Sequence, residues 1–128
     1  MKATHTDLPK SPEIKYTDQG IMVNQDIYHN PIIIHQDWQI KEQVSLTPTT
    51  WLDHPLRRTV TQILTWPELT PDMEILDLYW EQEIQIELLP LPAALQLIKI
   101  YQAENSDFQC VIFPKPIQRL DKTQADLK

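Results

Sequence analysis

The scarcity of glycine constrains what this chain can fold into more than any other feature of its sequence. Gly20 is the only glycine among 128 residues, which also include eleven prolines. A chain of this length has about nine glycines on average. Glycine-rich loops bring the backbone close to phosphate groups, so the chain lacks a dinucleotide fingerprint, a Walker A loop and a G-x-S-x-G nucleophile elbow. The enzyme classes built on those loops are excluded.

The net charge of −7 is confined to one stretch of the chain. Residues 59–98 contain no lysine or arginine and seven acids, namely Glu68, Asp72, Glu74, Asp77, Glu81, Glu83 and Glu87. The rest of the chain balances eleven acids against eleven bases. Such a stretch repels a phosphate backbone, which argues against nucleic acid as a partner. It predicts either a solvated face or a docking face for a basic partner.

Length and segment composition predict one soluble domain. Residues 14–116 form the expected α/β domain, with a flexible arm at 1–13 and a polar tail at 117–128. The first ten residues contain no apolar signal segment, and the apolar stretch at 88–95 is too short to span a bilayer. A single cysteine excludes an internal disulfide. We expect a cytoplasmic location, no membrane insertion and no cofactor.

The first half of the chain has the pattern of a β-meander. Strands are expected at 14–17, 21–23 and 31–35, joined by tight turns at 18–20 and 24–26. The isoleucines at 32–34 indicate a third strand that is buried on both faces and therefore central. Residues 36–50 are polar and irregular, with Trp38 and Leu46 as the expected anchors.

The second half predicts alternating helices and strands. A helix is expected to begin at Asp53, because apolar residues follow at helical spacing, and to end at Trp66–Pro67. Strands are expected at 73–80 and 83–88, a second helix over 91–101 and a final buried strand at 108–113. The fold class is therefore α/β, with an N-terminal antiparallel meander and a mixed sheet on which helices pack.

The opening segment YTDQGIMVNQDIYHNPIIIHQDW carries a family resemblance. With Val23, Asn24, Tyr28 and the isoleucines at 32–34, it resembles a family of small α/β domains that includes a mitochondrial complex I assembly factor and many uncharacterised bacterial and archaeal proteins. The resemblance covers residues 14 to about 115 and implies a fold more than an activity. Two departures make the chain a divergent, C-terminally shortened member. Residues 78–81 replace the family's glycine-rich turn, and the later Arg-Thr-Tyr-Asn segment is missing.

The residues with the most reactive side chains show no strong catalytic pattern. Cys110 lies in the middle of a predicted buried strand and is expected to pack in the core. The four histidines, at positions 5, 29, 35 and 54, lack metal-ligand spacing. His35 and Asp37 would share a strand face, and with His54 or Asp53 they could bind zinc or act as a base. The outward glutamates near residue 85 fit solubilising charges better than a catalytic carboxylate pair.

These observations predict a non-catalytic protein-binding or assembly module. Its partner would have a basic surface and would contact Tyr79, Trp80, Glu81, Glu83 and Glu87, at the end of the predicted strand 73–80. The alternative is a small-molecule-binding protein or enzyme with a pocket near His35, Asp37 and Trp80. A third possibility is self-association through the strand at 83–88, and the sequence leaves the oligomeric state open.

Overall fold

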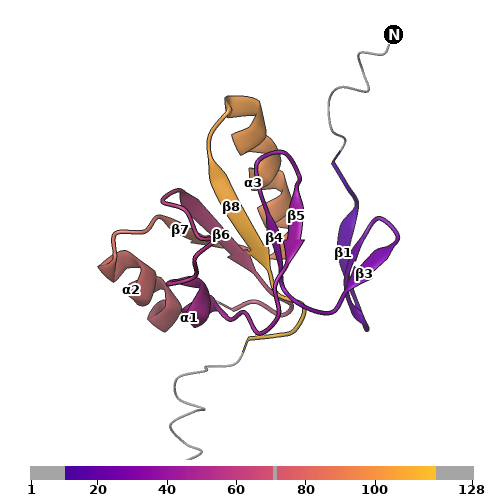
Figure 1. The fold of residues 1–128 in the computed structure, drawn as a ribbon, viewed down its shortest axis with the longest axis horizontal. Helices are drawn as coiled ribbons and strands as arrows, with labels where there is room; N and C mark the ends of the chain where they lie inside the picture. Colours follow the sequence, from indigo (N-terminus) through magenta and orange to yellow (C-terminus); the bar gives the residue numbers. More distant parts are fainter. Residues whose placement is uncertain (1–10, 71, 118–128) are drawn as a thin grey trace, which may run out of the picture.

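A computed structural model describes residues 11–70 and 72–117. These residues form eight strands and three helices (Figure 1). In chain order the elements are β1 (Ile14–Thr17), β2 (Gly20–Val23), β3 (Asp26–Tyr28), β4 (Ile32–Ile34), β5 (Ile40–Glu42), α1 (Pro48–Trp51), β6 (Thr61–Thr65), α2 (Met73–Glu81), β7 (Ile86–Leu88), α3 (Leu91–Glu104) and β8 (Phe108–Ile112).

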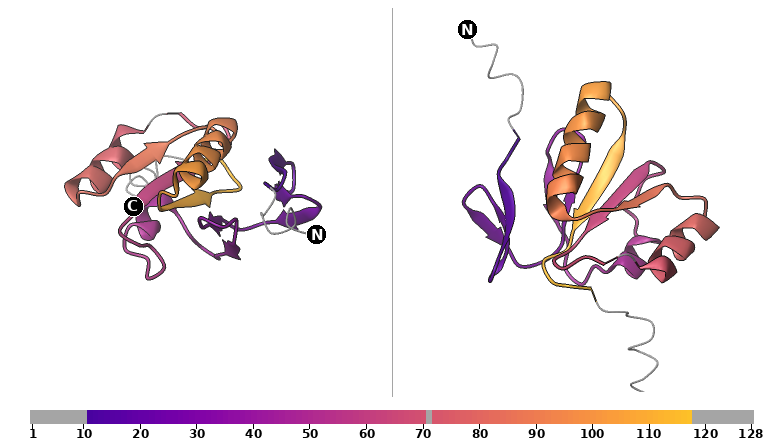
Figure 2. Two further views of the ribbon diagram at one scale, coloured as in Figure 1. Left: turned by 90° about the horizontal axis from the view of Figure 1, so that it is seen from above. Right: turned by 180° about the vertical axis from the view of Figure 1, so that it is seen from behind.

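The strands form two sheets, and the predicted α/β class is confirmed. The first is an antiparallel meander in the order β1-β2-β3. The second has the order β5-β4-β8-β6-β7, in which β4 is antiparallel to both neighbours and β6 is parallel to β7 and β8. The meander and α2 lie at opposite ends of the molecule (Figures 1 and 2).

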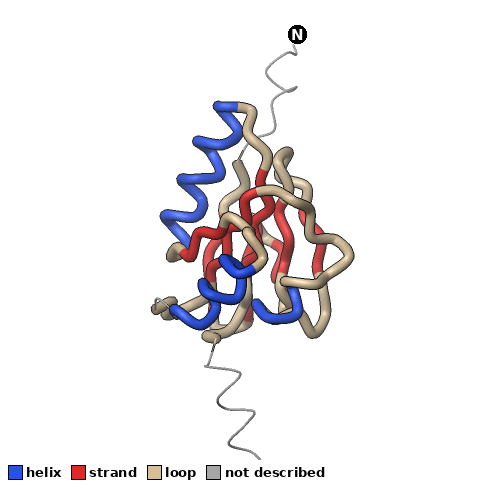
Figure 3. The backbone as a smooth tube through the Cα atoms, turned by 90° about the vertical axis from the view of Figure 1, so that its left-hand side faces the viewer, coloured by secondary structure: helices blue, strands red, loops and turns tan. Residues whose placement is uncertain are grey.

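Both faces of the five-stranded sheet are buried. Neighbouring residues of each strand point to opposite faces, so they pack into different clusters. Ile32 and Ile34 pack with α3 and the meander, whereas Ile33 packs with α1 and α2. The same alternation divides β8, where Cys110 faces the α3 side and Val111 the α2 side. The long helix α3 runs beside the strands, with the short helices below it (Figure 3). The sheet therefore separates two cores, one on each face.

The isoleucine strand was assigned to the wrong sheet, although its burial was predicted correctly. The third strand of the meander is β3, and β4 lies inside the second sheet with all three isoleucines fully buried. Residues 29–31 separate the two strands, and β4 pairs with β8 some eighty residues later in the chain. Long-range pairing of this kind leaves no local signal.

The scarcity of glycine is compensated by side-chain-bearing residues in left-handed conformations. Gly20 itself is obligatory, because its φ is +142° and an added Cβ would collide with the carbonyl oxygen of Tyr28. Among the described residues, the others with positive φ are Asn24, Trp38, Ser45, Glu68, Glu83 and Asn105. The left-handed region costs a residue with a side chain about 1–2 kcal/mol, less for asparagine. Most of these positions are therefore strained.

The helix predicted from Asp53 is wrong. Residues 61–65 form the interior strand β6, between β8 and β7, in which Ile63 faces one core and Leu64 the other. The β-branched residues from 59 to 65 fit a strand, and burial on both faces mimicked helical spacing. The short helix α1 precedes this segment, where Thr47 and Thr50 form a reciprocal capping box and Pro48 occupies the first turn.

The strand predicted at 73–80 is also wrong, because this segment is helix α2. The Asp72 carboxylate accepts hydrogen bonds from the backbone N–H groups of Glu74 and Ile75, at 3.0 and 3.3 Å, and so caps the helix. Ile75 and Tyr79, four residues apart, are the buried residues of α2. Capping and this spacing outweigh the partial alternation in the sequence.

The remaining elements agree with the expectations or extend them. Helix α3 and strand β8 are confirmed, and the predicted strand at 83–88 is reduced to β7 at the sheet edge. Strand β5 lies in the segment predicted to be irregular. The predicted arm at 1–13 and tail at 117–128 fall mostly outside the described residues.

Candidate functional site

The acidic stretch of the sequence is concentrated on and around helix α2. Met73, Asp77, Trp80 and Glu81 are its exposed residues, and their spacing of four, three and one places them along one side. We call this side the α2 outer face. Met73 is 57% exposed and Trp80 51% exposed. The outer face therefore combines two large apolar side chains with two carboxylates, and Met73 and Asp77 were missed in the sequence because a strand was expected there.

Tyr79 must be removed from the predicted partner-binding residues. It is fully buried between α2 and the sheet, and its hydroxyl donates a 2.7 Å hydrogen bond to the Pro48 carbonyl of α1. Burial raises the pKa of the Tyr79 hydroxyl, so it stays protonated. In a helix, residues 79 and 80 point about 100° apart, and only Trp80 reaches solvent.

The predicted glutamates lie on three different elements, and only Glu81 belongs to the outer face. Glu87 must be separated from it, because Ile86 and Leu88 pack on the α2 side of the sheet and Glu87 between them faces Tyr101 of α3. Glu81 ends α2, Glu83 lies in the following turn and Glu87 lies in β7. Hydrogen bonds from the Glu83 and Ile84 N–H groups to the carbonyls of Trp80 and Tyr79 form this turn, at 2.9 and 3.0 Å. Glu81 and Glu83 are exposed, and Glu87 is half-buried. Trp80 thus has carboxylates immediately after it on an ordered turn.

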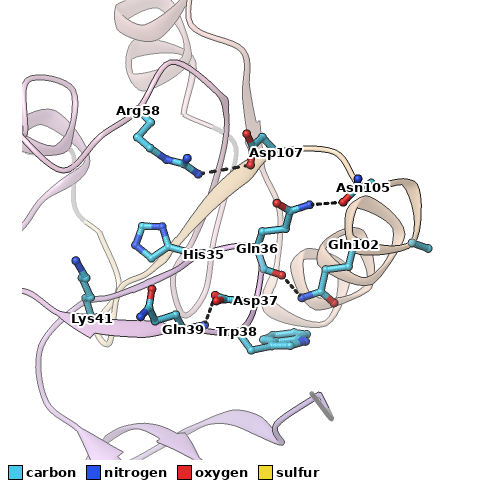
Figure 4. Close-up of a pocket in the computed structure, with 11 residues that line it drawn as sticks. His35, Gln36, Asp37, Trp38, Gln39, Lys41, Arg58, Gln102, Asn105 and Asp107 are labelled. Atoms are coloured by element: carbon cyan, nitrogen blue, oxygen red, sulfur yellow. Dashed lines mark hydrogen bonds and ion pairs between the residues drawn. The ribbon is translucent and has the colours of Figure 1, made fainter. Parts of the chain in front are cut away.

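A second candidate site is a cavity of about 860 Å³ at the β4–β5 hairpin. We call it the His35 pocket. The hairpin contributes His35, Asp37 and Lys41, the loop before β6 contributes Arg58, and the C-terminal end of α3 contributes Gln102 (Figure 4). The pocket residues therefore come from segments separated by more than sixty positions in the sequence.

The hairpin that forms one wall of the pocket is a strained turn. The His35 N–H donates to the Gln39 carbonyl and the Trp38 N–H donates to the His35 carbonyl, both at 3.0 Å. Asp37 accepts a 3.1 Å hydrogen bond from the Gln39 N–H. Trp38 has a φ of +63°, at the position where a three-residue hairpin usually has glycine. Strained backbone of this kind is concentrated at functional sites.

Side-chain amides hold the other walls in place. Gln102 donates a 2.7 Å hydrogen bond to the Gln36 carbonyl and so ties the hairpin to α3. The fully buried Gln109 accepts from the Arg58 N–H and donates to the Leu56 carbonyl, both at 2.8 Å. Gln62 adds a 3.0 Å bond to Gln109. This buried amide network positions the loop that carries Arg58.

The electrostatics of the pocket centre on His35. Desolvation, together with the nearby charges of Arg58 and Lys41, lowers the pKa of the imidazole, and Asp37 opposes this shift. The His35 Nε2 atom is buried and has no hydrogen-bond partner in the described part of the protein. At neutral pH the ring is therefore uncharged, and its buried Nε2 atom is left unsatisfied.

The predicted constellation around His35 is only partly assembled. His35 and Asp37 line the same pocket, but Trp80 is not among its lining residues and lies on α2. His54 accepts a hydrogen bond from the Leu56 N–H and contacts the Trp51 ring, and His29 contacts the Gln19 carbonyl. The residues at 11–70 and 72–117 contain no group of three or more metal-ligating side chains suited to an ion. His5 lies outside these ranges.

Cys110 lies where the sequence placed it, in the core. It is fully buried on the α3 side of β8, and burial raises the pKa of its thiol far above the physiological range. None of the helices in the described ranges has the length and apolar character needed to cross a bilayer.

Comparison with known proteins identifies a fold. No family model and no curated protein matches the chain. Among solved structures, Xanthomonas campestris XCC1710 has a TM-score of 0.60 at 15% identity, over 93% of this chain and 96% of that one. A Bordetella parapertussis protein has a TM-score of 0.55 at 15% identity, over 81% and 96%. A Bartonella henselae protein described as an outer membrane protein has a TM-score of 0.51 at 18% identity, over 85% and 99%.

The structural neighbours also include a Mth938-like domain from Bordetella pertussis, at a TM-score of 0.48 and 14% identity. The neighbours with TM-scores above 0.5 show a shared architecture, and at these identities they leave the role of the chain to its own residues. The three neighbours with TM-scores above 0.5 are covered over 96–99% of their length, so their architecture as a whole is shared with this chain.

Proposed function

We propose that this protein is a non-catalytic binding module that docks a basic protein partner through the α2 outer face. The observation that carries this proposal is the 51% exposure of Trp80 on a helix whose other exposed residues include carboxylates. A tryptophan side chain buries a large hydrophobic area when a partner covers it, and tryptophan is enriched among the residues that contribute most to binding energy.

Charge complementarity defines the chemistry of the partner. The outer face and its adjoining turn place Asp77, Glu81 and Glu83 around Trp80, within the stretch that carries the full net charge of the protein. Carboxylates at the rim of an interface steer a basic partner and suppress acidic ones, while a central aromatic side chain supplies affinity. A partner with a basic rim and an apolar recess fits both the carboxylates and the Trp80 side chain.

The proposal includes an assembly-type role and a cytoplasmic location. The family resemblance of the N-terminal segment, with its complex I assembly factor, supports the former. The single, buried free cysteine suits the latter, because the cytoplasm is a reducing compartment. Loss of the family's glycine-rich turn favours protein binding over an ancestral ligand site, because residues 78–81 form the last turn of α2 instead.

Photocrosslinking followed by affinity measurement tests the proposal. A photoreactive amino acid replaces Trp80, and in a matched variant it replaces Ile100, which is 45% exposed on α3. We expect position 80 to capture a protein with a basic surface that position 100 does not capture. The purified partner should then bind the unmodified protein with an affinity that falls as salt rises.

Two substitutions assign that binding to the outer face. Trp80→Ala and Glu81→Lys should each weaken the purified complex by about tenfold or more, and Ile100→Ala should leave it unchanged. Equal capture at both positions would contradict the proposal. So would an affinity that neither Trp80→Ala nor Glu81→Lys changes.

A further inference from the structure

We propose that the His35 pocket binds a small metabolite through an oxyanion, either a carboxylate or a phosphate group. This site is separate from the α2 outer face, and it does not depend on the function proposed above. Pockets for small molecules typically measure about 300–1,000 Å³, and the cavity of about 860 Å³ falls within that range.

Two cations and two carboxylates line the pocket, and Lys41 and Asp37 are the two that have no ion pair within residues 11–70 and 72–117. Arg58 pairs with Asp107 at 3.6 Å, and the Asp37 carboxylate accepts the Gln39 N–H. Lys41 lies in strand β5 and is exposed. Its ammonium group acts on His35 across the pocket, and Figure 4 shows the imidazole between the side chains of Lys41 and Arg58.

His35 supplies the second observation that points to a ligand. Its buried Nε2 atom lacks a partner, although an unsatisfied buried polar atom costs about 1–3 kcal/mol. A neutral imidazole with a proton on Nε2 donates one hydrogen bond to an oxygen. An oxyanion beside Lys41 would accept that bond, satisfy His35 and neutralise the lysine at once.

The geometry of the walls indicates that the site is preorganised. The strained turn at Trp38 is held by the bond from Gln102 to the Gln36 carbonyl, and the Arg58 loop is held by Gln109. Binding therefore requires little ordering of the backbone, which lowers its entropic cost. The exposed amide of Gln39 lies along the same cavity, as does the half-buried amide of Gln36, which donates a 3.4 Å hydrogen bond to Asn105. Each can bond further oxygens of a metabolite.

The test is an NMR titration of the full chain at constant ionic strength, with sodium chloride as the balancing salt. Inorganic phosphate is added in one arm and acetate in the other. We expect saturable shifts of the His35 ring and of the Gln36, Gln39 and Lys41 amides. We also expect the pKa of His35 to rise, because a bound anion favours the imidazolium. Saturation by phosphate alone would identify a phosphorylated ligand, saturation by acetate alone a carboxylate ligand, and saturation by both a site open to either.

Matched charge variants distinguish binding at a defined site from non-specific electrostatic attraction. Lys41→Gln removes the unpaired cation and should weaken binding by about tenfold or more. Lys99→Gln removes an exposed lysine of α3 that does not line the pocket, and should leave binding unchanged. Shifts that never saturate, or an equal loss in both variants, would overturn the proposal. An unchanged amide spectrum away from the pocket confirms that Lys41→Gln remains folded.

Discussion

The α2 outer face and the His35 pocket are built in opposite ways. The first is one side of a regular, capped helix, and its chemistry comes from residues within nine positions of one another. The second joins a hairpin, a loop and a helix end through side-chain bonds such as that between Gln102 and the Gln36 carbonyl. Their charges differ as well, because carboxylates surround Trp80, whereas Lys41 and Arg58 flank His35.

The two regions should therefore tolerate substitutions differently. Side chains on the outer face of a helix can be replaced with little effect on folding, since they contact solvent. The pocket depends on backbone positions held by buried amides, so substitutions there alter both stability and shape.

The contrast is sharpest between two neighbouring residues of α2. Tyr79→Ala removes a fully buried ring and should lower the free energy of unfolding by about 3–5 kcal/mol. Trp80→Ala removes a half-exposed ring and should change it by about 0.5 kcal/mol or less. Urea denaturation followed by circular dichroism measures both. Comparable losses at the two positions would refute the assignment of Tyr79 to the core and Trp80 to the surface.

Gln109→Leu should damage the pocket from within the core. It leaves the Leu56 carbonyl and the Arg58 N–H without their partner, at an expected cost of at least about 1–3 kcal/mol. Hydrogen exchange at the Arg58 amide should accelerate as the loop loosens. Gln102→Leu, which removes only the tether to the hairpin, serves as the control and should leave that amide protected. An Arg58 amide that stays protected in Gln109→Leu would disprove the role of the network.

Relief of backbone strain should separate stability from binding. Glu83→Gly replaces an exposed residue with a φ of +59° and should raise the free energy of unfolding by about 0.5–1 kcal/mol. The same change should weaken the binding of a basic partner, because it removes a carboxylate beside Trp80. Ser45→Gly relieves similar strain at a φ of +64° without altering charge, so it should stabilise the protein and leave binding intact. Thermal denaturation and affinity measurements check both variants. A destabilised Glu83→Gly protein would contradict the claim that the backbone at residue 83 is strained.

The pH dependence of stability gives the smallest expected effect. The pKa of His35 in the folded protein lies below its usual value near 6.5, so the unfolded chain takes up a proton first as pH falls. The free energy of unfolding should therefore decrease below about pH 6.5, with a slope well under the single-proton limit of about 1.4 kcal/mol per pH unit because the ring is partly solvated. His35→Gln should flatten this decline. Superimposable pH profiles for the two proteins would contradict the electrostatic description of the pocket.

The candidate sites were predictable from the sequence to different degrees. The acidic stretch that includes Glu81 and Glu83 is a local property of the sequence, and so is the pairing of His35 with Asp37. Lys41, Arg58 and Gln102 could not be joined to that pair, because β4, β8 and β6 become neighbours only through long-range pairing. The error at Tyr79 has a local cause, since a strand and a helix place successive residues at different angles.

The α/β class, the buried strands around Ile33 and Val111, the helix α3 and the confinement of charge to one stretch can all be derived from the amino-acid sequence. These features follow from composition and short-range periodicity, which act within a few residues of the chain. Long-range packing was needed to establish that residues 61–65 form a strand and residues 73–81 a helix. Burial on both faces gave the first segment an ambiguous pattern, and the Asp72 cap with the buried Tyr79 stabilised the second. The structure also explains how the chain forms its turns with a single glycine. Trp38 and Glu83 adopt left-handed conformations, because packing and hydrogen bonds outweigh their backbone strain.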